Sequence, residues 1–191
     1  MADIGSVSTV ELANVGSVAG VNIANIGSID GANAAALPCS SWGDDVTDET
    51  LAIGNENPSY IGSAYDDVLD VGDAGGSWYC YTTTYINHGW TGQNFTSIGA
   101  KTISKYRIYT HLGVRSYDPK DWTFEASNTG AWAGEEVILD TQVNQAFVVD
   151  TWQDYEFENN TSYNYYRLNV SANNGHATYL IITEIEMREC V

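Results

Sequence analysis

The sequence has very few basic residues. Seven Lys and Arg side chains stand against 25 Asp and Glu side chains, which gives the 191 residues a formal net charge of -18. A chain this acidic repels the phosphates of nucleic acids and the anionic headgroups of membranes. We therefore expect no nucleic-acid partner, no membrane attachment, and a binding partner that is neutral or basic.

Cysteine and long apolar runs are also scarce. Cys39, Cys80 and Cys190 are too few and too scattered for a disulfide scaffold, and no Cys-x-x-Cys pair indicates zinc. Buried free thiols are therefore the expected state. No segment approaches the length of a membrane span, and residues 1–6 carry an acid but no basic residue of a signal peptide. We expect synthesis in the cytoplasm without an export signal.

The motifs of common catalytic sites are missing as well. His88, His111 and His176 lie far apart, and neither a His-Glu-x-x-His motif nor a Gly-x-Ser-x-Gly nucleophile turn occurs. The pair Glu135-Glu136 lies in a loop bounded by glycine, which is more typical of a solvated turn than of the carboxylate pair of a glycosidase. We predict that the protein is not an enzyme.

The second half of the chain instead shows a period of two. Apolar and aromatic residues recur at alternate positions, so that each strand would bury one face. The alternating residues are Tyr106, Ile108 and Thr110, then Trp122, Phe124 and Ala126, and then Tyr166, Leu168 and Val170. The pattern predicts an all-β antiparallel sandwich. The predicted core residues are Trp78, Trp122, Tyr166, Leu168 and Ile185.

Two runs resemble a known family. The run Pro-x-Asp-Trp-Thr-Phe-x-Ala-Ser-Asn at 119–128 and the run Tyr-Tyr-Arg-Leu at 165–168 resemble the discoidin-like family, the coagulation-factor C-type β-sandwich. They are most similar to its family 32 carbohydrate-binding modules and to versions found in bacteriophage structural proteins. The resemblance covers roughly the last three-fifths of the chain. It implies a galactose-binding-like antiparallel β-sandwich, or jelly roll.

The resemblance also bears on cysteine pairing. In this family the two ends of the chain lie side by side, and Cys39 and Cys190 flank the predicted sandwich. A disulfide between them is therefore the alternative to free thiols.

A structural calcium ion is a further implication. In many members an acidic turn and a carboxylate of the final strand meet around calcium, and the matching positions here are Asp70 and Glu184. The sequence departs from the family, because its Asp-Gly pair is Asp70-Val71 here. The alternative is that Asp70 caps a turn and Glu184 binds backbone. No other cofactor is expected.

Sugar binding would use loops at one end of the sandwich. A sugar is held by an aromatic ring against its apolar face and by planar polar groups that reach adjacent hydroxyls. By the resemblance, three loops that carry such residues cluster at one end. The candidate glycan-binding residues are Arg115, Trp90, His88, Tyr117, Asn174 and His176. Alternatively, Trp90 belongs to the core and Arg115 pairs with one of the many carboxylates.

The first thirty residues repeat every 11 residues, with Ile-Gly-Ser, Val-Gly-Ser and Ile-Gly-Ser opening three units at residues 4, 15 and 26. An 11-residue period suits a right-handed helical supercoil, but each glycine would cost a helix about 1 kcal/mol and Val and Ile favour extended chain. We therefore predict a β-arm. Its apolar positions are Ile4, Val7, Val10, Leu12, Val15, Val18, Val21, Ile23, Ile26 and Ile29.

Such an arm cannot bury its apolar side chains alone, because ordering costs ~1 to 2 kcal/mol per residue. Three identical chains winding together would solve this, so we predict a homotrimer. A solenoid stub packed on the sandwich and an arm threaded into a neighbouring protein are the competing arrangements.

The sequence thus predicts two parts, a β-arm at 1–36 for trimerisation or virion anchoring and a discoidin-like sandwich at 37–191. The expected function is that of a non-enzymatic protein on a virion surface, a phage-like fibre or decoration protein that displays the sandwich for binding glycans or host surfaces. The alternative is a capsid or tail cement protein whose sandwich binds no sugar. The expected partners are other copies of the chain, other virion proteins and a cell-surface glycan.

Overall fold

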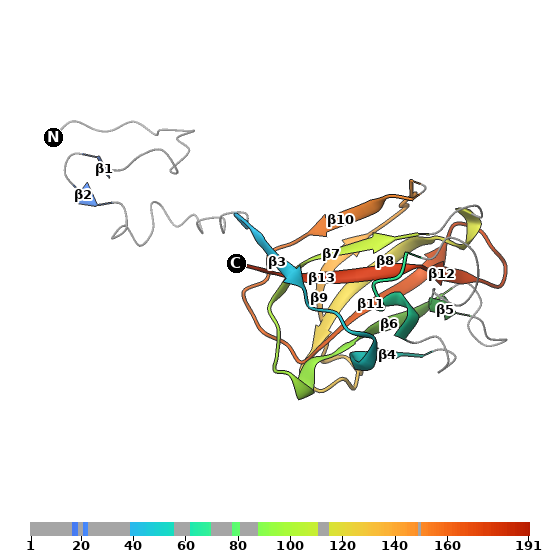
Figure 1. Cartoon of the computed structure of the whole chain (residues 1–191), viewed down its shortest axis with the longest axis horizontal. Coiled ribbons are helices and arrows are strands. Elements are labelled where there is room, and N and C mark those ends of the chain that lie inside the picture. Colours follow the sequence, from blue (N-terminus) through green and yellow to red (C-terminus); the bar gives the residue numbers. More distant parts are fainter. Residues whose placement is uncertain are drawn as a thin grey trace. The chain divides into compact units, whose positions relative to one another are not determined.

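The computed structural model describes residues 39–55, 62–69, 88–110, 115–148 and 150–191, and the backbone of 17–18, 21–22 and 78–80. The chain divides into two compact units, Met1–Leu37 and Pro38–Val191 (Figure 1). In the first unit, β1 (Ser17–Val18) pairs with β2 (Val21–Asn22) in antiparallel fashion. Apart from Val18 and Val21, the apolar positions of the predicted arm lie outside the described residues, so the predicted trimer stays a prediction.

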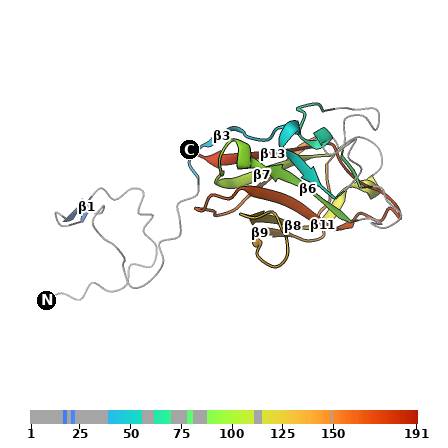
Figure 2. The same cartoon turned by 90° about the horizontal axis from the view of Figure 1, so that it is seen from below.

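The second unit consists mainly of two antiparallel sheets. One has the order β10 (Trp152–Glu156), β7 (Ile103–Tyr109), β13 (Glu184–Cys190), β3 (Trp42–Asp45). The other has the order β4 (Ala52–Gly54), β6 (Gly89–Asn94), β11 (Tyr165–Asn173), β8 (Pro119–Ser127), β9 (Val137–Gln142). In Figure 2, β3, β7 and β13 lie above β8, β9 and β11. The predicted antiparallel β-sandwich is therefore confirmed.

Short elements complete the unit. β5 (Trp78–Cys80) pairs with β12 (Leu180–Ile182), and the described residues of the unit also form the 3-10 helices η3 (Glu49–Leu51), η4 (Gly62–Ala64), η5 (Phe95–Ser97) and η6 (Arg115–Tyr117). Within the described parts of the chain, no helix is long and apolar enough to cross a membrane.

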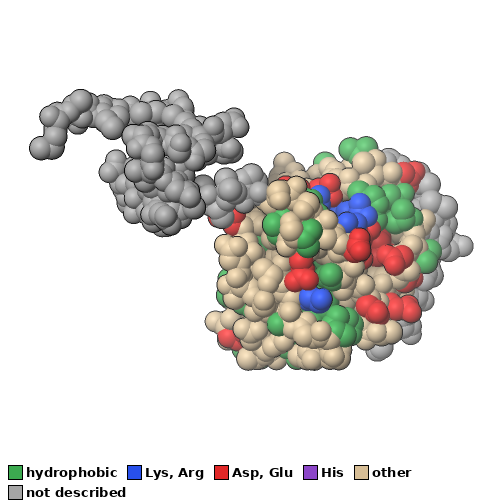
Figure 3. All heavy atoms as spheres, turned by 60° about the vertical axis from the view of Figure 1, so that its left-hand side comes forward, with side chains coloured by type: hydrophobic (Ala, Val, Ile, Leu, Met, Phe, Trp, Pro, Cys, Tyr) green, Lys and Arg blue, Asp and Glu red, His purple; other side chains and the backbone are tan. Residues whose placement is uncertain are grey.

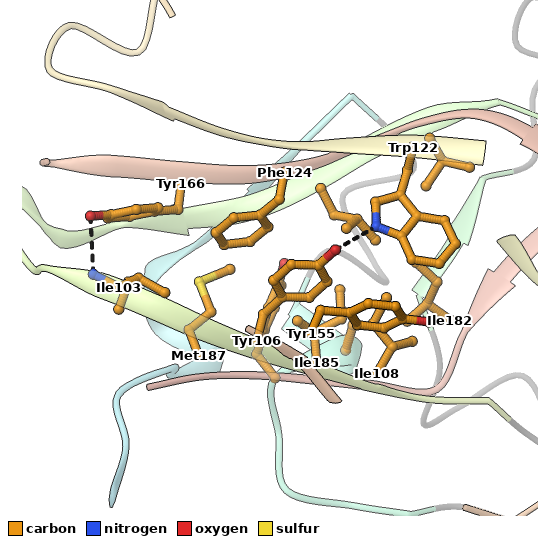
Figure 4. Close-up of a cluster of buried hydrophobic side chains, with 14 of the residues drawn as sticks. Ile103, Tyr106, Ile108, Trp122, Phe124, Tyr155, Tyr166, Ile182, Ile185 and Met187 are labelled. Atoms are coloured by element: carbon orange, nitrogen blue, oxygen red, sulfur yellow. Dashed lines mark hydrogen bonds between the residues drawn. The ribbon is translucent and has the colours of Figure 1, made fainter. Parts of the chain in front are cut away.

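The alternating residues fill the space between the sheets. Tyr106, Phe124 and Tyr166 are fully buried, and the rings of Tyr106 and Phe124 stack with centroids 4.3 Å apart (Figure 4). Burying each such side chain stabilises the fold by roughly 1.5 to 3 kcal/mol. Trp122 and Ile185 are buried as predicted, whereas the side chain of Trp78 lies outside the described residues.

Polar atoms of the core are paired across the two sheets. The indole N–H of Trp122 on β8 donates to the hydroxyl of Tyr106 on β7 at 2.7 Å. The hydroxyl of Tyr166 on β11 accepts from the backbone N–H of Ile103 at 3.2 Å and donates to the Lys101 carbonyl at 2.6 Å. Because unpaired buried hydroxyls are costly, these bonds fix how one sheet lies on the other.

A disulfide joins the two ends of the sandwich. Cys39 and Cys190 are bonded, with their Cα atoms 5.6 Å apart, and Ser41 exchanges hydrogen bonds with Val191 beside them. The prediction of free thiols is therefore wrong for these two residues, and the alternative is right. The bridge spans 151 positions of sequence. In the chain-entropy model a loop this long gives a stabilisation of about 5 kcal/mol.

The basic side chains serve to neutralise carboxylates. Six of the seven form ion pairs with Asp or Glu, namely Lys101, Lys105, Arg107, Arg115, Arg167 and Arg188. On the face drawn in Figure 3, Lys and Arg side chains lie directly beside Asp and Glu side chains. These cations are therefore arranged as partners of carboxylates and not as a surface for a polyanion.

Candidate functional site

A pocket of about 270 Å³ opens where β8 begins and β11 ends. Its lining residues are Arg115, Ser116, Asp118, Ala146, Phe147 and Asn174. They come from η6, from the segment between β9 and β10, and from the turn after β11. The volume lies just below the range of pockets that hold drug-sized ligands, so it suits a molecule the size of one sugar ring.

The guanidinium of Arg115 is held in the pocket wall. One of its terminal nitrogens donates to Oδ2 of Asp118 at 3.1 Å and to the backbone carbonyl of Phe147 at 3.0 Å. Arg115 therefore pairs with a carboxylate, as the alternative interpretation expected, and it also lines a pocket, while its contact with a sugar stays a prediction. The fixed, planar guanidinium presents donors without a large loss of side-chain entropy on binding.

Asn174 ties the pocket loops together. Its side-chain amide donates to the carbonyls of Asp118, Pro119 and Gln145 at 3.3, 3.1 and 3.3 Å. Its backbone N–H donates to the Asp118 carbonyl at 3.0 Å. The side-chain oxygen of Asn174 takes no part in these bonds and is an acceptor that the site can offer to a hydroxyl.

Three aromatic rings lie next to the pocket. Tyr117 contacts His176 edge-on with centroids 4.2 Å apart, and Tyr179 lies 5.5 Å from Tyr117. Nδ1 of His176 accepts from the backbone N–H groups of Thr178 and Tyr179, so the neutral ring carries its proton on Nε2. The cluster is joined to the pocket wall by the backbone N–H of His176, which donates to the Ser116 carbonyl at 3.0 Å.

The carboxyl of Asp118 is the titratable group of this site. Burial raises its pKa to about 6, although the positive charge of Arg115 acts in the opposite direction. The Arg115–Asp118 ion pair therefore forms fully only above about pH 6, which is close to the range in which many proteins work.

The structure brings together only part of the predicted glycan site. Arg115, Tyr117, Asn174 and His176 lie in or beside the pocket. Trp90 and His88 do not line it. His88 is exposed just before β6. Trp90 is on β6 itself, where the guanidinium of Arg167 lies 5.5 Å from the centre of its ring.

Sequence reasoning missed several pocket residues, and the reasons differ. Asp118 and Phe147 are 29 positions apart, so no local pattern connects them. Tyr179 was detectable, because it closes the polar turn that follows β11 and aromatic side chains commonly line ligand pockets.

A second group of residues surrounds Glu184. This side chain is 1% exposed, and neither carboxylate oxygen has a hydrogen-bond partner among the described residues. Burial and the negative charges of Asp66 and Asp67 raise the pKa of Glu184 to about 9. A buried carboxylate without a partner is costly, and a cation would remove that cost.

The neighbouring carboxylates extend this acidic region. Ligand atoms of Asp45, Asp67 and Glu186 lie within 4.8 Å of one another. Asp45 already accepts from Thr47 and from the Met187 N–H, and Glu186 is paired with two arginines, which leaves Glu184 as the carboxylate that lacks compensation. The donor set of hard carboxylate oxygens fits calcium.

The structure describes only one of the two calcium ligands predicted from sequence, and the calcium ion stays a prediction. Glu184 lies among acidic residues as expected, whereas Asp70 lies outside the described residues. Asp67 has the left-handed backbone, with φ 59°, that glycine adopts most easily. The pair Asp66-Asp67 therefore stands where an Asp-Gly pair would fit, four positions before the pair assigned from sequence.

Comparison with known proteins gives a likeness of structure only. No family model matches the sequence, and a search of curated proteins finds no match. Among solved structures, the family 32 module of C. perfringens NanJ in complex with galactose has a TM-score of 0.57 at 13% identity, over 76% of this chain and 98% of that one. The CBM62 module of Clostridium thermocellum Xyl5A has a TM-score of 0.58 at 16% identity, over 76% and 96%.

A third similar structure is an F5/8 type C domain from Bacteroides fragilis, with a TM-score of 0.52 at 13% identity, over 79% of this chain and 93% of that one. Identities this low establish architecture and leave ligands open. The chain therefore has the galactose-binding-like β-sandwich fold that family 32 carbohydrate-binding modules share with F5/8 type C domains.

Proposed function

We propose that this protein binds a glycan in the pocket beside Arg115 and performs no catalysis. The observation that carries the proposal is a pocket lined by a fixed guanidinium and an amide, with the rings of Tyr117 and His176 beside it. This combination matches a sugar ring, which has one apolar face and a rim of hydroxyls. The non-catalytic modules that share the fold support this choice over an enzyme.

The pocket is small, so a single site would bind weakly. Linked copies of one module gain affinity because the second binding event becomes intramolecular. We therefore propose that the N-terminal repeats form a trimerising or anchoring arm, and that the assembly is displayed on the surface of a phage-like virion. The 11-residue repeat and the acidic surface support this part of the proposal.

We further propose that the region around Glu184 holds a structural calcium ion. Asp67, with the Asp45 and Glu186 carboxylates whose ligand atoms lie within 4.8 Å of its own, would bind it, and the ion would offset the negative charge around Glu184. Its role would be to hold the acidic turn against β13, without contact with the sugar.

A glycan array with three forms of the full-length protein tests the sugar site. We expect the wild type to bind, Arg115→Ala to lose binding, and Lys101→Ala to retain it. Lys101 is the matched control, because it also belongs to an ion pair but lies beside Tyr163, at the other end of the sandwich. If the folded wild type binds no glycan, the proposed glycan binding is wrong and the cement function is favoured.

A further inference from the structure

A second group of aromatic side chains lies on the outer face of the five-stranded sheet, the side turned away from the other sheet. Trp90 of β6 and Trp132 of the loop after β8 are both partly exposed, and their ring centroids are 5.9 Å apart. The guanidinium of Arg167 on β11 lies 4.1 Å from the Trp132 ring and 5.5 Å from the Trp90 ring. We call these three residues the tryptophan cluster. None of them lines the pocket.

The side chain of Arg167 supports the two indole rings from the sheet side and is held in place by an ion pair. It is 8% exposed, and its Nε and terminal nitrogen donate to Oε2 of Glu125 at 2.7 and 2.6 Å. One face of the Trp132 indole rests on this buried guanidinium, and the Trp132 side chain as a whole stays partly exposed. The ion pair also cancels the charge, so the surface under the rings is close to neutral.

The loop holds Trp132 in an unfavourable backbone conformation. Its φ is 50°, a left-handed value that bulky residues rarely adopt. The carboxylate of Glu135 accepts hydrogen bonds from the Trp132 N–H, from Ser127 and from Thr129, and so fixes the loop in this form. Strain of this kind persists where the surroundings over-determine it, which is common at ligand-binding sites.

Uncharged polar side chains continue the surface from Trp90. Asn169 on β11 lies opposite Trp90 on one side and opposite Thr123 on the other, and Thr141 on β9 lies opposite Thr123. The row crosses four strands, which is about 14 Å at the usual strand spacing. An aromatic ring followed by hydroxyl and amide groups over this length suits a chain of sugars better than a single ring.

We propose that the outer face is a second carbohydrate-binding surface, which takes a segment of a neutral polysaccharide with one sugar stacked on the Trp132 ring. Charge argues for a neutral polymer, because Arg167 is already paired and the net charge of -18 would repel a polyanion. The row of Asn and Thr argues for a sugar chain over a protein partner, since the centre of a protein interface is more apolar.

Affinity gel electrophoresis tests this surface with galactomannan, xyloglucan and mixed-linkage β-glucan as neutral polymers and alginate as an anionic one. The variants are Trp132→Gly, which suits the left-handed backbone, and Trp90→Ala. Ile98→Ser removes an exposed apolar side chain elsewhere and is the control, and Arg115→Ala reports on the pocket. Thermal melting confirms that each variant is folded.

We expect at least one neutral polymer to retard the wild type, Ile98→Ser and Arg115→Ala, and to bind Trp132→Gly and Trp90→Ala about tenfold more weakly or worse. Retention of binding in Arg115→Ala would separate this surface from the pocket. The proposal is overturned if no neutral polymer retards the folded wild type, if Trp132→Gly is retarded like the wild type, or if alginate is preferred. Self-association lost in Trp132→Gly would assign the face to a second copy and also overturn it.

Discussion

Arg115 and Asp118 form an ion pair of 3.1 Å that is built into the wall of the pocket, three positions apart on the chain. The pair fixes the guanidinium but also makes the site sensitive to pH, because the carboxyl of Asp118 is buried.

The pKa of Asp118 predicts how stability changes with pH. Its folded value of about 6 exceeds the usual 3.8, so the folded state binds the proton more tightly than the unfolded chain. The resulting stabilisation is complete below about pH 4 and is lost as the pH rises through about 6, an effect on the order of 2 to 3 kcal/mol. We expect Asp118→Asn to match the wild type near pH 4 and to be more stable at pH 7. Urea unfolding between about pH 4 and pH 7 measures the free energy of unfolding of both proteins. A difference between them that does not change with pH would contradict the prediction.

Calcium should stabilise the domain through Glu184. We expect the melting temperature of the wild type to rise in calcium and to fall in chelator, by an amount equivalent to about 2.7 kcal/mol at a hundredfold excess over the Kd. Glu184→Gln should not respond, because the buried charge that needs compensation is gone. Glu158→Gln, an exposed carboxylate, is the matched control and should respond like the wild type. Equal melting of the wild type in calcium and chelator would exclude the site.

The disulfide predicts sensitivity to reductants. Reduction, or the variant Cys39→Ser/Cys190→Ser, should lower the free energy of unfolding by about 2 to 5 kcal/mol. Thiol titration of the unfolded, unreduced protein should find one reactive thiol, from Cys80. Reductant should leave the double variant unchanged. Three titratable thiols in the purified protein would show that the bridge does not form.

The repeat arm predicts a difference between two lengths of chain. Full-length protein should have the mass of a trimer by light scattering, and a chain that starts at Pro38 should be a monomer, because the apolar positions of the arm would be removed. A monomeric full-length protein would refute trimerisation.

The core could be predicted from sequence because its signal is local. Trp122, Phe124, Tyr166 and Leu168 alternate along their strands, and burial of one strand face follows directly from that period. The strand β6 was harder, since its sequence Gly-Trp-Thr-Gly-Gln-Asn suggests a loop. Gly92 is needed there, because a Cβ would meet the Tyr166 carbonyl. We placed Trp90 in a loop from the sequence, and this was wrong because Gly89–Asn94 form the strand β6.

The sites depend on contacts that no local pattern encodes. The pocket joins Asp118 to Phe147, and the tryptophan cluster joins Trp90 to Trp132 and Arg167 across three segments. The pairing of Cys39 with Cys190 was accessible only as an alternative, through the resemblance to a family whose ends meet. Sequence thus predicted the layers of the sandwich well and the positions of its functional side chains less well.

The bond between Cys39 and Cys190 also decides how the domain bears mechanical load. A pull on the chain at Pro38 would otherwise reach β3 first, an edge strand of four residues, and would peel its hydrogen bonds away one after another. The sulfur link passes the tension directly to β13, which is bonded to a strand on each side. Tension at this point therefore acts on an inner strand of the sheet as well as on its edge strand.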